Sequence, residues 1–174
     1  THSFPTRRSS DLCTMNTVAD INQIEIILRL LLIILLSGLI GIERKHYHKP
    51  AGFRTNVMVG LGSAIIAMTA IYIFHNFNPS NTMDIGRMVG QIVTGIGFLG
   101  AGAIIQSRGS VHGLTTAASI WVVAAIGLAT GLGFYWLAMF GTLAALVVLI
   151  ILGRIEHKFE NKIFHEESEQ HFKE

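Results

Sequence analysis

The sequence predicts an all-α, polytopic integral membrane protein with five transmembrane helices. Of the 174 residues, 51% are hydrophobic and only 14% are charged. The mean hydropathy of +0.52 is too high for a soluble domain of this size. The apolar residues come in blocks long enough to cross a bilayer. The 18 glycines against three prolines also fit tightly packed membrane helices better than a linker-rich chain.

Residues 1–14 are set apart from this prediction. They begin with THSFPTRRSSDL, the peptide that one frame of a common sequencing adaptor encodes. The alternative is a short basic targeting segment, but no apolar stretch follows it until Ile26. We therefore take Met15 as the expected start of the native protein. Cys13, the single cysteine, falls in the excluded segment, so no internal disulfide is expected.

Residues 15–153 form the predicted membrane domain, in which short polar segments separate the spans. Basic residues gather after the first, third and fifth spans, whereas the native segments on the other side carry only Arg29 and Arg87. By the positive-inside rule, the N-terminus lies outside and the C-terminus is cytoplasmic. Residues 154–174 form a short charged tail, whose first part continues the last helix along the membrane surface. The predicted spans are residues 23–42, 55–74, 85–106, 114–132 and 135–152.

Local signals mark the ends of several spans. Glu25 and Arg29 lie one turn apart at the start of the first span, where they can form an ion pair. Thr55 or Asn56 can cap the second span. The aromatic residues that follow the fourth span, of which Tyr135 is one, suit the outer membrane interface.

The loop after the first span carries charges at the inner membrane edge. Glu43 and Arg44 begin this loop at the membrane edge, and Arg54 lies across the loop. These residues are either ordinary juxtamembrane charges or a buried salt-bridge cluster under the centre of the bundle. Thr115 and Thr116, at the start of the fourth span, either join this inner cluster or simply cap their helix.

The third span is predicted to be the functional helix, because two kinds of residue recur along it at helical spacing. Polar residues three and four positions apart share one face; they are Asp84, Arg87, Gln91 and Thr94. They serve either as a cap and helix contacts or as a polar pocket or ion path, since polar groups at membrane depth are costly. A neighbouring face of small residues lets another helix come close: Gly86, Gly90, Thr94, Gly97 and Ala101.

Motifs for catalysis and for metal binding are missing from the sequence. The histidines occur without an HExxH pattern or a Cys/His set, and no GxSxG, P-loop or dinucleotide fingerprint is present. A membrane-embedded hydrolase would lack a nucleophile–base pair. We therefore expect no enzyme, no cofactor, no metal site and no nucleic-acid partner. The expected partners are the lipid bilayer, other membrane proteins and further copies of the chain.

Four motifs carry a family resemblance: GLIGIER, KPAGFRTN, QIVTGIGFLGAGAII and GLTTAASIW. Their order and spacing over about residues 38–131 resemble the membrane domain of the MgtC/SapB family. The resemblance implies a multi-pass bacterial inner-membrane protein associated with low magnesium, acid stress and, in pathogens, virulence. It implies functional positions in the first loop and in the third and fourth spans: Glu43, Arg44, Pro50, Gly52, Arg54, Thr55, Gln91, Gly95, Gly97, Gly100, Gly102, Gly113, Leu114, Thr115, Thr116 and Trp121.

Two functions are compatible with these patterns. The first is a non-enzymatic regulatory protein that binds other membrane proteins through small-residue faces on spans two, three and five. The second is a small oligomeric transporter or channel for Mg²⁺ or another ion. Asp84 is the one acidic residue on the polar line, so a divalent cation would need carbonyls, waters or several subunits. This favours the first function.

Some family members carry a cytoplasmic regulatory domain, for which the tail here is too short.

Overall fold

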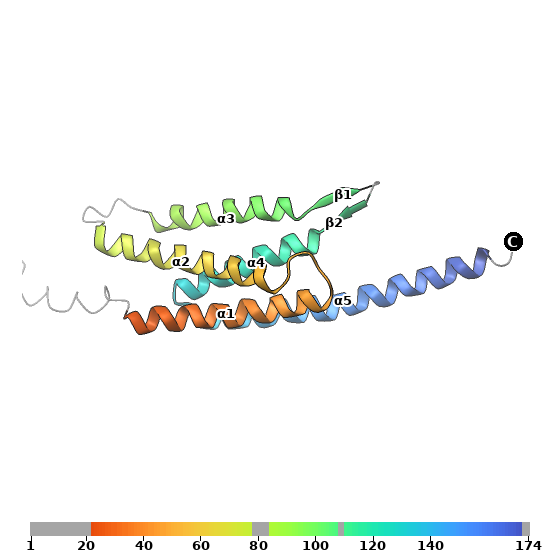
Figure 1. Cartoon of the computed structure of the whole chain (residues 1–174), viewed down its shortest axis with the longest axis horizontal. Coiled ribbons are helices and arrows are strands. Elements are labelled where there is room, and N and C mark those ends of the chain that lie inside the picture. Colours follow the sequence, from red (N-terminus) through yellow and green to blue (C-terminus); the bar gives the residue numbers. More distant parts are fainter. Residues whose placement is uncertain (1–21, 78–83, 108–109, 172–174) are drawn as a thin grey trace, which may run out of the picture.

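The computed structural model describes residues 22–77, 84–107 and 110–171. Within these ranges the chain forms five helices that lie side by side along one long axis, and a short antiparallel hairpin (Figure 1). The segment predicted to be an artefact, residues 1–14, lies outside the described residues. The elements are α1 (Gln23–His46), α2 (Phe53–Phe77), α3 (Ile85–Gly102), β1 (Ile105–Ser107), β2 (Ser110–His112), α4 (Leu114–Gly131) and α5 (Tyr135–His171).

The predicted class, an all-α polytopic membrane protein, is confirmed by this architecture. Among the helices that the structure describes, four are long and apolar enough to cross a membrane, namely α1, α2, α4 and α5. The helix α3 is 18 residues long and is not among the four. Arg87 and Gln91, two strongly polar residues, lower its apolar character. The orientation of the chain, with its N-terminus outside, stays a prediction.

Helix α4 is the centre of the bundle, because it packs against each of the other four helices of the described chain. Within its span 56% of the residues are buried, against 11% for α5. The helix α3 packs on α2 and α4 and lies along the edge of the bundle (Figure 1). Its buried residues form one narrow stripe, Ile92, Ile96 and Gly100. The rest of α3 therefore faces away from the core.

Small residues bring the backbones of α1, α2 and α4 into direct contact. A Cβ at Gly131 of α4 would lie 2.6 Å from the carbonyl oxygen of Ala64 in α2, and a Cβ at Gly127 would overlap the Gly60 carbonyl oxygen. At the α1–α2 contact, a Cβ at Gly41 would lie 2.7 Å from the Cα of Phe53. The small residues predicted on one side of the second span include Gly60 and Ala64, and these two pack against α4 inside the bundle.

Several helix ends differ from the predicted bounds. The helix α2 begins at Phe53, since the backbone N–H of Asn56 already donates to the Gly52 carbonyl oxygen. Thr55 is therefore an exposed residue of the first turn, and neither Thr55 nor Asn56 is the cap that we predicted. At the other end of the chain, α5 is continuous through the predicted tail to His171.

The third helix ends at Gly102, four residues before the predicted end at Gln106. The next residues pair in the hairpin instead, where Ile105 lies opposite His112. Gly113 makes this possible because its φ of 91° is readily available to glycine, and because a Cβ there would overlap the Ala103 carbonyl oxygen. The hairpin thus returns directly onto the end of α3 before α4 begins.

At the opposite end of the bundle, the predicted ion pair of Glu25 and Arg29 is confirmed, with 2.5 Å between Oε1 and Nη2. The arginine also donates through Nε to the Tyr135 hydroxyl at 3.0 Å and through Nη1 to the Gly131 carbonyl oxygen at 2.5 Å. The Tyr135 hydroxyl in turn donates to Glu25 Oε1 at 3.1 Å. This set, which we call the α1–α5 clamp, ties α1 to the turn between α4 and α5.

Candidate functional site

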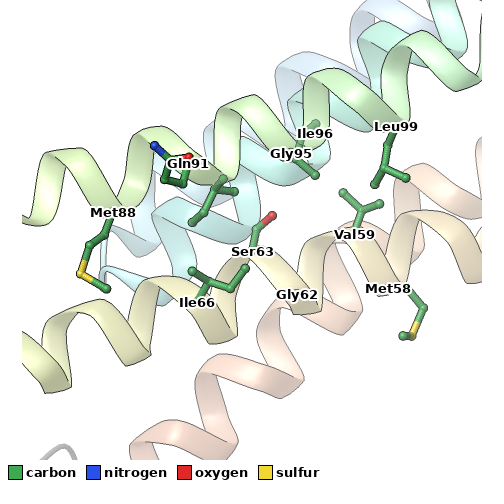
Figure 2. A pocket seen from close by; sticks show the side chains of 11 residues that line it. Met58, Val59, Gly62, Ser63, Ile66, Met88, Gln91, Gly95, Ile96 and Leu99 are labelled. Carbon is green, nitrogen blue, oxygen red and sulfur yellow. The ribbon is translucent and has the colours of Figure 1, made fainter.

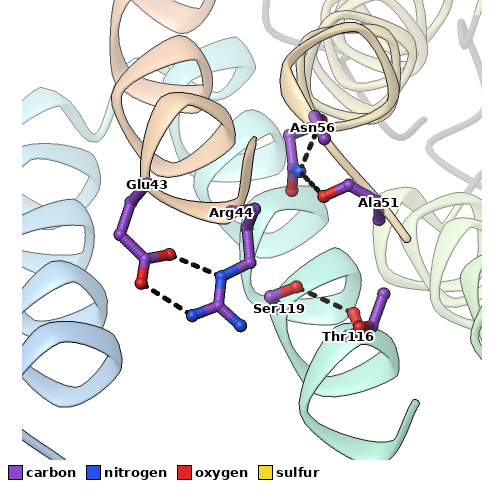
Figure 3. A network of polar contacts seen from close by, with 7 residues as sticks. Glu43, Arg44, Ala51, Asn56, Thr116 and Ser119 are labelled. Carbon is purple, nitrogen blue, oxygen red and sulfur yellow. Dashed lines mark hydrogen bonds and ion pairs between the residues drawn. The ribbon is translucent and has the colours of Figure 1, made fainter. Parts of the chain in front are cut away.

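A buried ion pair lies at the end of the bundle where α1 ends and α2 begins, the end that the sequence predicts to be cytoplasmic (Figure 3). Arg44 donates through Nε to Oε2 of Glu43 at 2.5 Å and through Nη2 to Oε1 at 2.8 Å. The two residues are 3% and 8% exposed, so they are not ordinary juxtamembrane charges. Breaking a buried pair by removing one partner costs about 3–5 kcal/mol, because the other charge is left buried and alone. The sequence prediction of a buried salt bridge is confirmed for this pair.

Polar residues of α2 and α4 lie on the side of Arg44 away from Glu43 (Figure 3). Asn56 is fully buried, and its side-chain amide donates to the carbonyl oxygens of Ala51 and Gly52 at 3.0 and 2.9 Å. In α4, Ser119 donates through Oγ to the Thr116 carbonyl oxygen at 2.8 Å, and both residues are buried. We call this set, with Glu43 and Arg44, the inner polar cluster.

Two of the predicted members do not belong to the inner polar cluster. Arg54 is exposed on the first turn of α2, on the side of the helix opposite the buried Asn56. Thr115 is also exposed and lines a cavity between α1, α4 and α5. The prediction missed Asn56 and Ser119 as members. Their signals were the asparagine in the KPAGFRTN motif and the i,i+3 spacing of Thr116 and Ser119.

Residues of three motifs meet in a cavity of about 340 Å³ at the same end, between α2, α3 and α4. The lining includes Pro50 and Thr55 from the first loop motif, Gly102 from the third span and Thr116 from the fourth. Gly52 follows Ala51, another lining residue, but does not itself line the cavity. Sequence motifs that are far apart in the chain are thus gathered at one end of the bundle.

The predicted polar line on α3 lies outside the core of the bundle. Asp84 caps the helix, where its Oδ1 accepts from the Gly86 amide at 2.8 Å. Arg87, Gln91 and Thr94 are exposed, and Thr94 donates through Oγ1 to the Gly90 carbonyl oxygen at 3.2 Å. These positions do not face the centre of this single chain.

A groove of about 390 Å³ runs between α2 and α3 (Figure 2). Its walls are almost entirely apolar, with Gln91 of α3 and Ser63 of α2 as the polar residues among them. Ser63 is only 2% exposed, and its Oγ has no hydrogen-bond partner among the described residues. The other lining residues are Met58, Val59, Gly62, Ile66, Met88, Ile92, Gly95, Ile96 and Leu99.

Most glycines of α3 are not required by packing within this chain. A Cβ at Gly90, Gly95, Gly97 or Gly102 would meet no atom within 4 Å. Gly100 is buried, but even there the nearest atom would be the Cβ of Ala117 at an ordinary 3.7 Å. The predicted small-residue face is therefore present on α3 and open. No group of three or more His, Cys, Asp or Glu side chains suited to a metal ion occurs in the part of the chain that the structure describes.

Comparison with known proteins agrees with the resemblance of the four motifs. The chain is 41% identical over 143 residues to the Putative magnesium transporter YhiD of Escherichia coli, covering 81% of this chain and 66% of that protein. It is 41% identical over 126 residues to Protein MgtC of Salmonella typhimurium, covering 72% of this chain and 52% of MgtC. Protein SrpB of Synechococcus elongatus is 38% identical over 136 residues, with 74% and 75% of the two chains covered.

The chain thus spans about two thirds of the length of YhiD and about half of MgtC. No solved structure matches it. The model of the MgtC family matches residues 30–158, which include most of the bundle and the inner polar cluster. Since this match covers most of the chain, the protein belongs to the MgtC family.

Proposed function

We propose that this chain is a non-enzymatic regulatory protein of the bacterial inner membrane that acts by binding other membrane proteins. In this proposal it serves adaptation to low magnesium, to acid or to conditions inside a host. The contact surface is the outer face of α3, which we define as Arg87, Gly90, Thr94, Gly97 and Ala101. All five residues are exposed.

One observation carries the proposal: the glycines of the outer face have no neighbour that requires them to be small. Glycine weakens an isolated helix by about 1 kcal/mol per residue relative to alanine, so glycines at open positions need another reason. In a membrane, small residues allow the backbone of a second helix to approach closely, and polar side chains then bond across the contact. Thr94 and the neighbouring Gln91 supply such side chains.

The proposed orientation places the N-terminus outside and the inner polar cluster at the cytoplasmic side. The basic residues Arg44, Lys45, Lys49 and Arg54 at that end support this orientation by the positive-inside rule. The outer face of α3 then lies within the bilayer, where the candidate partners are the transmembrane helices of other proteins.

Affinity purification in a mild detergent tests the proposal. A tagged wild-type chain should recover a specific membrane protein, and Gly97→Leu should lose it because the added side chain fills the contact. Gly153→Leu is the matched control, since a Cβ at Gly153 of α5 would also meet no atom within 4 Å, whereas the helices that pack on α3 are α2 and α4. Recovery of the same partner by Gly97→Leu, or recovery of the chain itself alone, would contradict the proposal.

A small oligomeric transporter for Mg²⁺ or another ion is the alternative. It is favoured by the name of the Escherichia coli relative, a putative magnesium transporter. The polar line of α3 would then face a path shared between several copies of the chain. Purified protein in liposomes should move the ion, and flux that is unchanged by Gln91→Leu combined with Asp84→Asn would rule out this path.

A further inference from the structure

The cavity of about 340 Å³ between α2, α3 and α4 is lined by two hydroxyl groups, those of Thr55 and Thr116. Neither hydroxyl bonds to another residue in the part of the chain that the structure describes. A helical threonine can donate to the carbonyl oxygen four residues earlier. For Thr55 this is the Ala51 carbonyl oxygen, which already accepts from the Asn56 side chain at 3.0 Å. Thr116 lies in the first turn of α4 and has no such carbonyl oxygen in its own helix. Both hydroxyls are therefore available to a molecule in the cavity.

The walls of this cavity suit part of an amphipathic molecule. Thr55 is exposed, whereas Thr116 is 98% buried and lies on the inner wall, on the side of Arg44 away from Glu43 (Figure 3). The α3 wall is apolar and includes Phe98, which is 81% exposed. The volume lies at the lower end of the roughly 300–1,000 Å³ typical of ligand pockets. The cavity thus combines hydroxyl donors with an apolar wall that is open to the surroundings.

Two cations adjoin the lining of this cavity. Lys49 precedes the lining residue Pro50, and Arg54 precedes Thr55. Both cations are exposed, and neither forms an ion pair with a described residue. Among the side chains that the structure describes at this end of the bundle, the one carboxylate is Glu43, which is buried in the ion pair of the inner polar cluster. The uncompensated positive charge favours an anionic ligand.

The depth of the cavity indicates a lipid. Thr55 is the third residue of α2, whose candidate span is Phe53–Asn76, so its hydroxyl lies at the membrane edge. Phospholipid ester groups lie at this level, directly below the phosphate, and a hydroxyl can donate to an ester carbonyl oxygen. Val59 and Leu99 line both this cavity and the α2–α3 groove, so apolar surface continues from the cavity toward the bilayer centre. An acyl chain can follow this surface, whereas a soluble anion gains nothing from it.

We propose that this cavity binds one anionic phospholipid. Its ester carbonyl oxygens accept from Thr55 and Thr116, and its headgroup lies against Lys49 and Arg54. Basic pockets between transmembrane helices bind anionic lipid headgroups in other membrane proteins. The site goes beyond the proposed function, since no residue of the outer face of α3 lines this cavity.

Native mass spectrometry of the purified protein in mild detergent tests the proposal. Phosphatidylglycerol and phosphatidylcholine with identical acyl chains are the probes. The wild type should bind one phosphatidylglycerol roughly tenfold or more tightly than phosphatidylcholine, because each cation near an anionic lipid contributes about fivefold. Replacing both cations, Lys49→Gln with Arg54→Gln, should remove this preference and leave phosphatidylcholine binding nearly unchanged. Arg154→Gln is the matched control, since Arg154 is an exposed cation of α5, a helix that lines no part of the cavity.

The hydroxyl groups should behave differently from the cations. Thr55→Val should weaken both lipids alike, by about fivefold, because the two lipids share the ester groups and one hydrogen bond is lost. Thr69→Val is the matched control, since Thr69 is a hydroxyl residue of α2 outside the cavity, and it should bind both lipids as the wild type does. Gly102→Leu should abolish binding of both, since a Cβ there meets no atom within 4 Å and the leucine would fill the cavity.

Three outcomes would overturn the proposal. The first is equal affinity of the wild type for the two lipids. The second is a preference for phosphatidylglycerol that survives in the variant without Lys49 and Arg54. The third is displacement of phosphatidylglycerol by glycerol phosphate at equal concentration, which would make the cavity a site for a soluble phosphate compound and not for a lipid.

Discussion

Two glycine-rich surfaces of this protein have opposite roles. At the α2–α4 contact, a Cβ on Gly131 would lie 2.6 Å from a backbone oxygen, so glycine is required for the helices to meet. On the outer face of α3, a Cβ on Gly90 or Gly97 would meet nothing. The first surface therefore builds the fold. The second is free to bind a partner, and the residue type alone does not tell the two apart.

The largest expected effect separates these surfaces directly. Gly127→Leu should destabilise the protein by about 3 kcal/mol or more, because the new side chain overlaps the Gly60 backbone and forces α2 and α4 apart. The free energy of unfolding in bicelles measures this. Gly97→Leu is the matched control and should not destabilise the protein; it should raise the free energy of unfolding by up to about 1 kcal/mol, the gain in helix propensity over glycine.

Alanine variants at the same two positions repeat the comparison in case the Gly127→Leu protein does not fold. Gly127→Ala adds one methyl group at a position that has no room for it, whereas Gly97→Ala adds it in open space. If both alanine variants changed the free energy of unfolding equally, the distinction between a closed and an open surface would be wrong.

The inner polar cluster should give an effect of similar size. Arg44→Met should cost about 3–5 kcal/mol, since the Glu43 carboxylate would stay buried without its partner. Arg54→Met is the control and should change the free energy of unfolding by less than about 1 kcal/mol, because Arg54 is exposed. Replacing both members, Glu43→Leu with Arg44→Met, should recover most of the loss. A double variant that is as unstable as Arg44→Met would contradict this account.

The helices themselves could be predicted because each apolar block is long and ends at polar or glycine-rich residues. The pair of Glu25 and Arg29 could also be predicted, since residues four apart share a helix face regardless of how helices pack. The end of α3 could not be predicted from the sequence. It depends on a hairpin whose closure requires the backbone angles of Gly113, a property of three-dimensional geometry rather than of hydrophobicity.

The members of the candidate site were harder to predict than the helices. Arg54 and Asn56 lie two positions apart and therefore about 200° apart around the axis of α2, so only one of them can turn into the bundle, and the packing of α2 decides which. Ser63 gave no signal in the sequence, since a serine in an apolar helix most often bonds to its own backbone. Only the packing of α3 beside α2 makes it part of a groove.

The α1–α5 clamp should give an intermediate effect. Tyr135→Phe removes the hydroxyl that bonds to both Arg29 and Glu25, and we expect a loss of about 1–2 kcal/mol because two hydrogen bonds disappear. Trp136→Phe is the control, since Trp136 is exposed, and it should change the free energy of unfolding far less. An equal loss in both variants would show that the aromatic residues at the α4–α5 turn stabilise this end of the bundle, and not the hydrogen bonds of the clamp.

The smallest effect on stability should accompany a large effect on function. Gln91→Leu replaces an exposed amide, so the free energy of unfolding should change by less than about 0.5 kcal/mol. Growth of a deletion strain in low Mg²⁺ should nevertheless fail when it is complemented with this variant, since α3 no longer offers the amide that bonds to the partner protein. Asp84→Asn keeps the cap on Gly86 and should complement normally. Arg54→Gln should impair growth only if the exposed guanidinium group of Arg54 also binds the partner protein. Full growth with Gln91→Leu would show that the function of α3 does not depend on this amide.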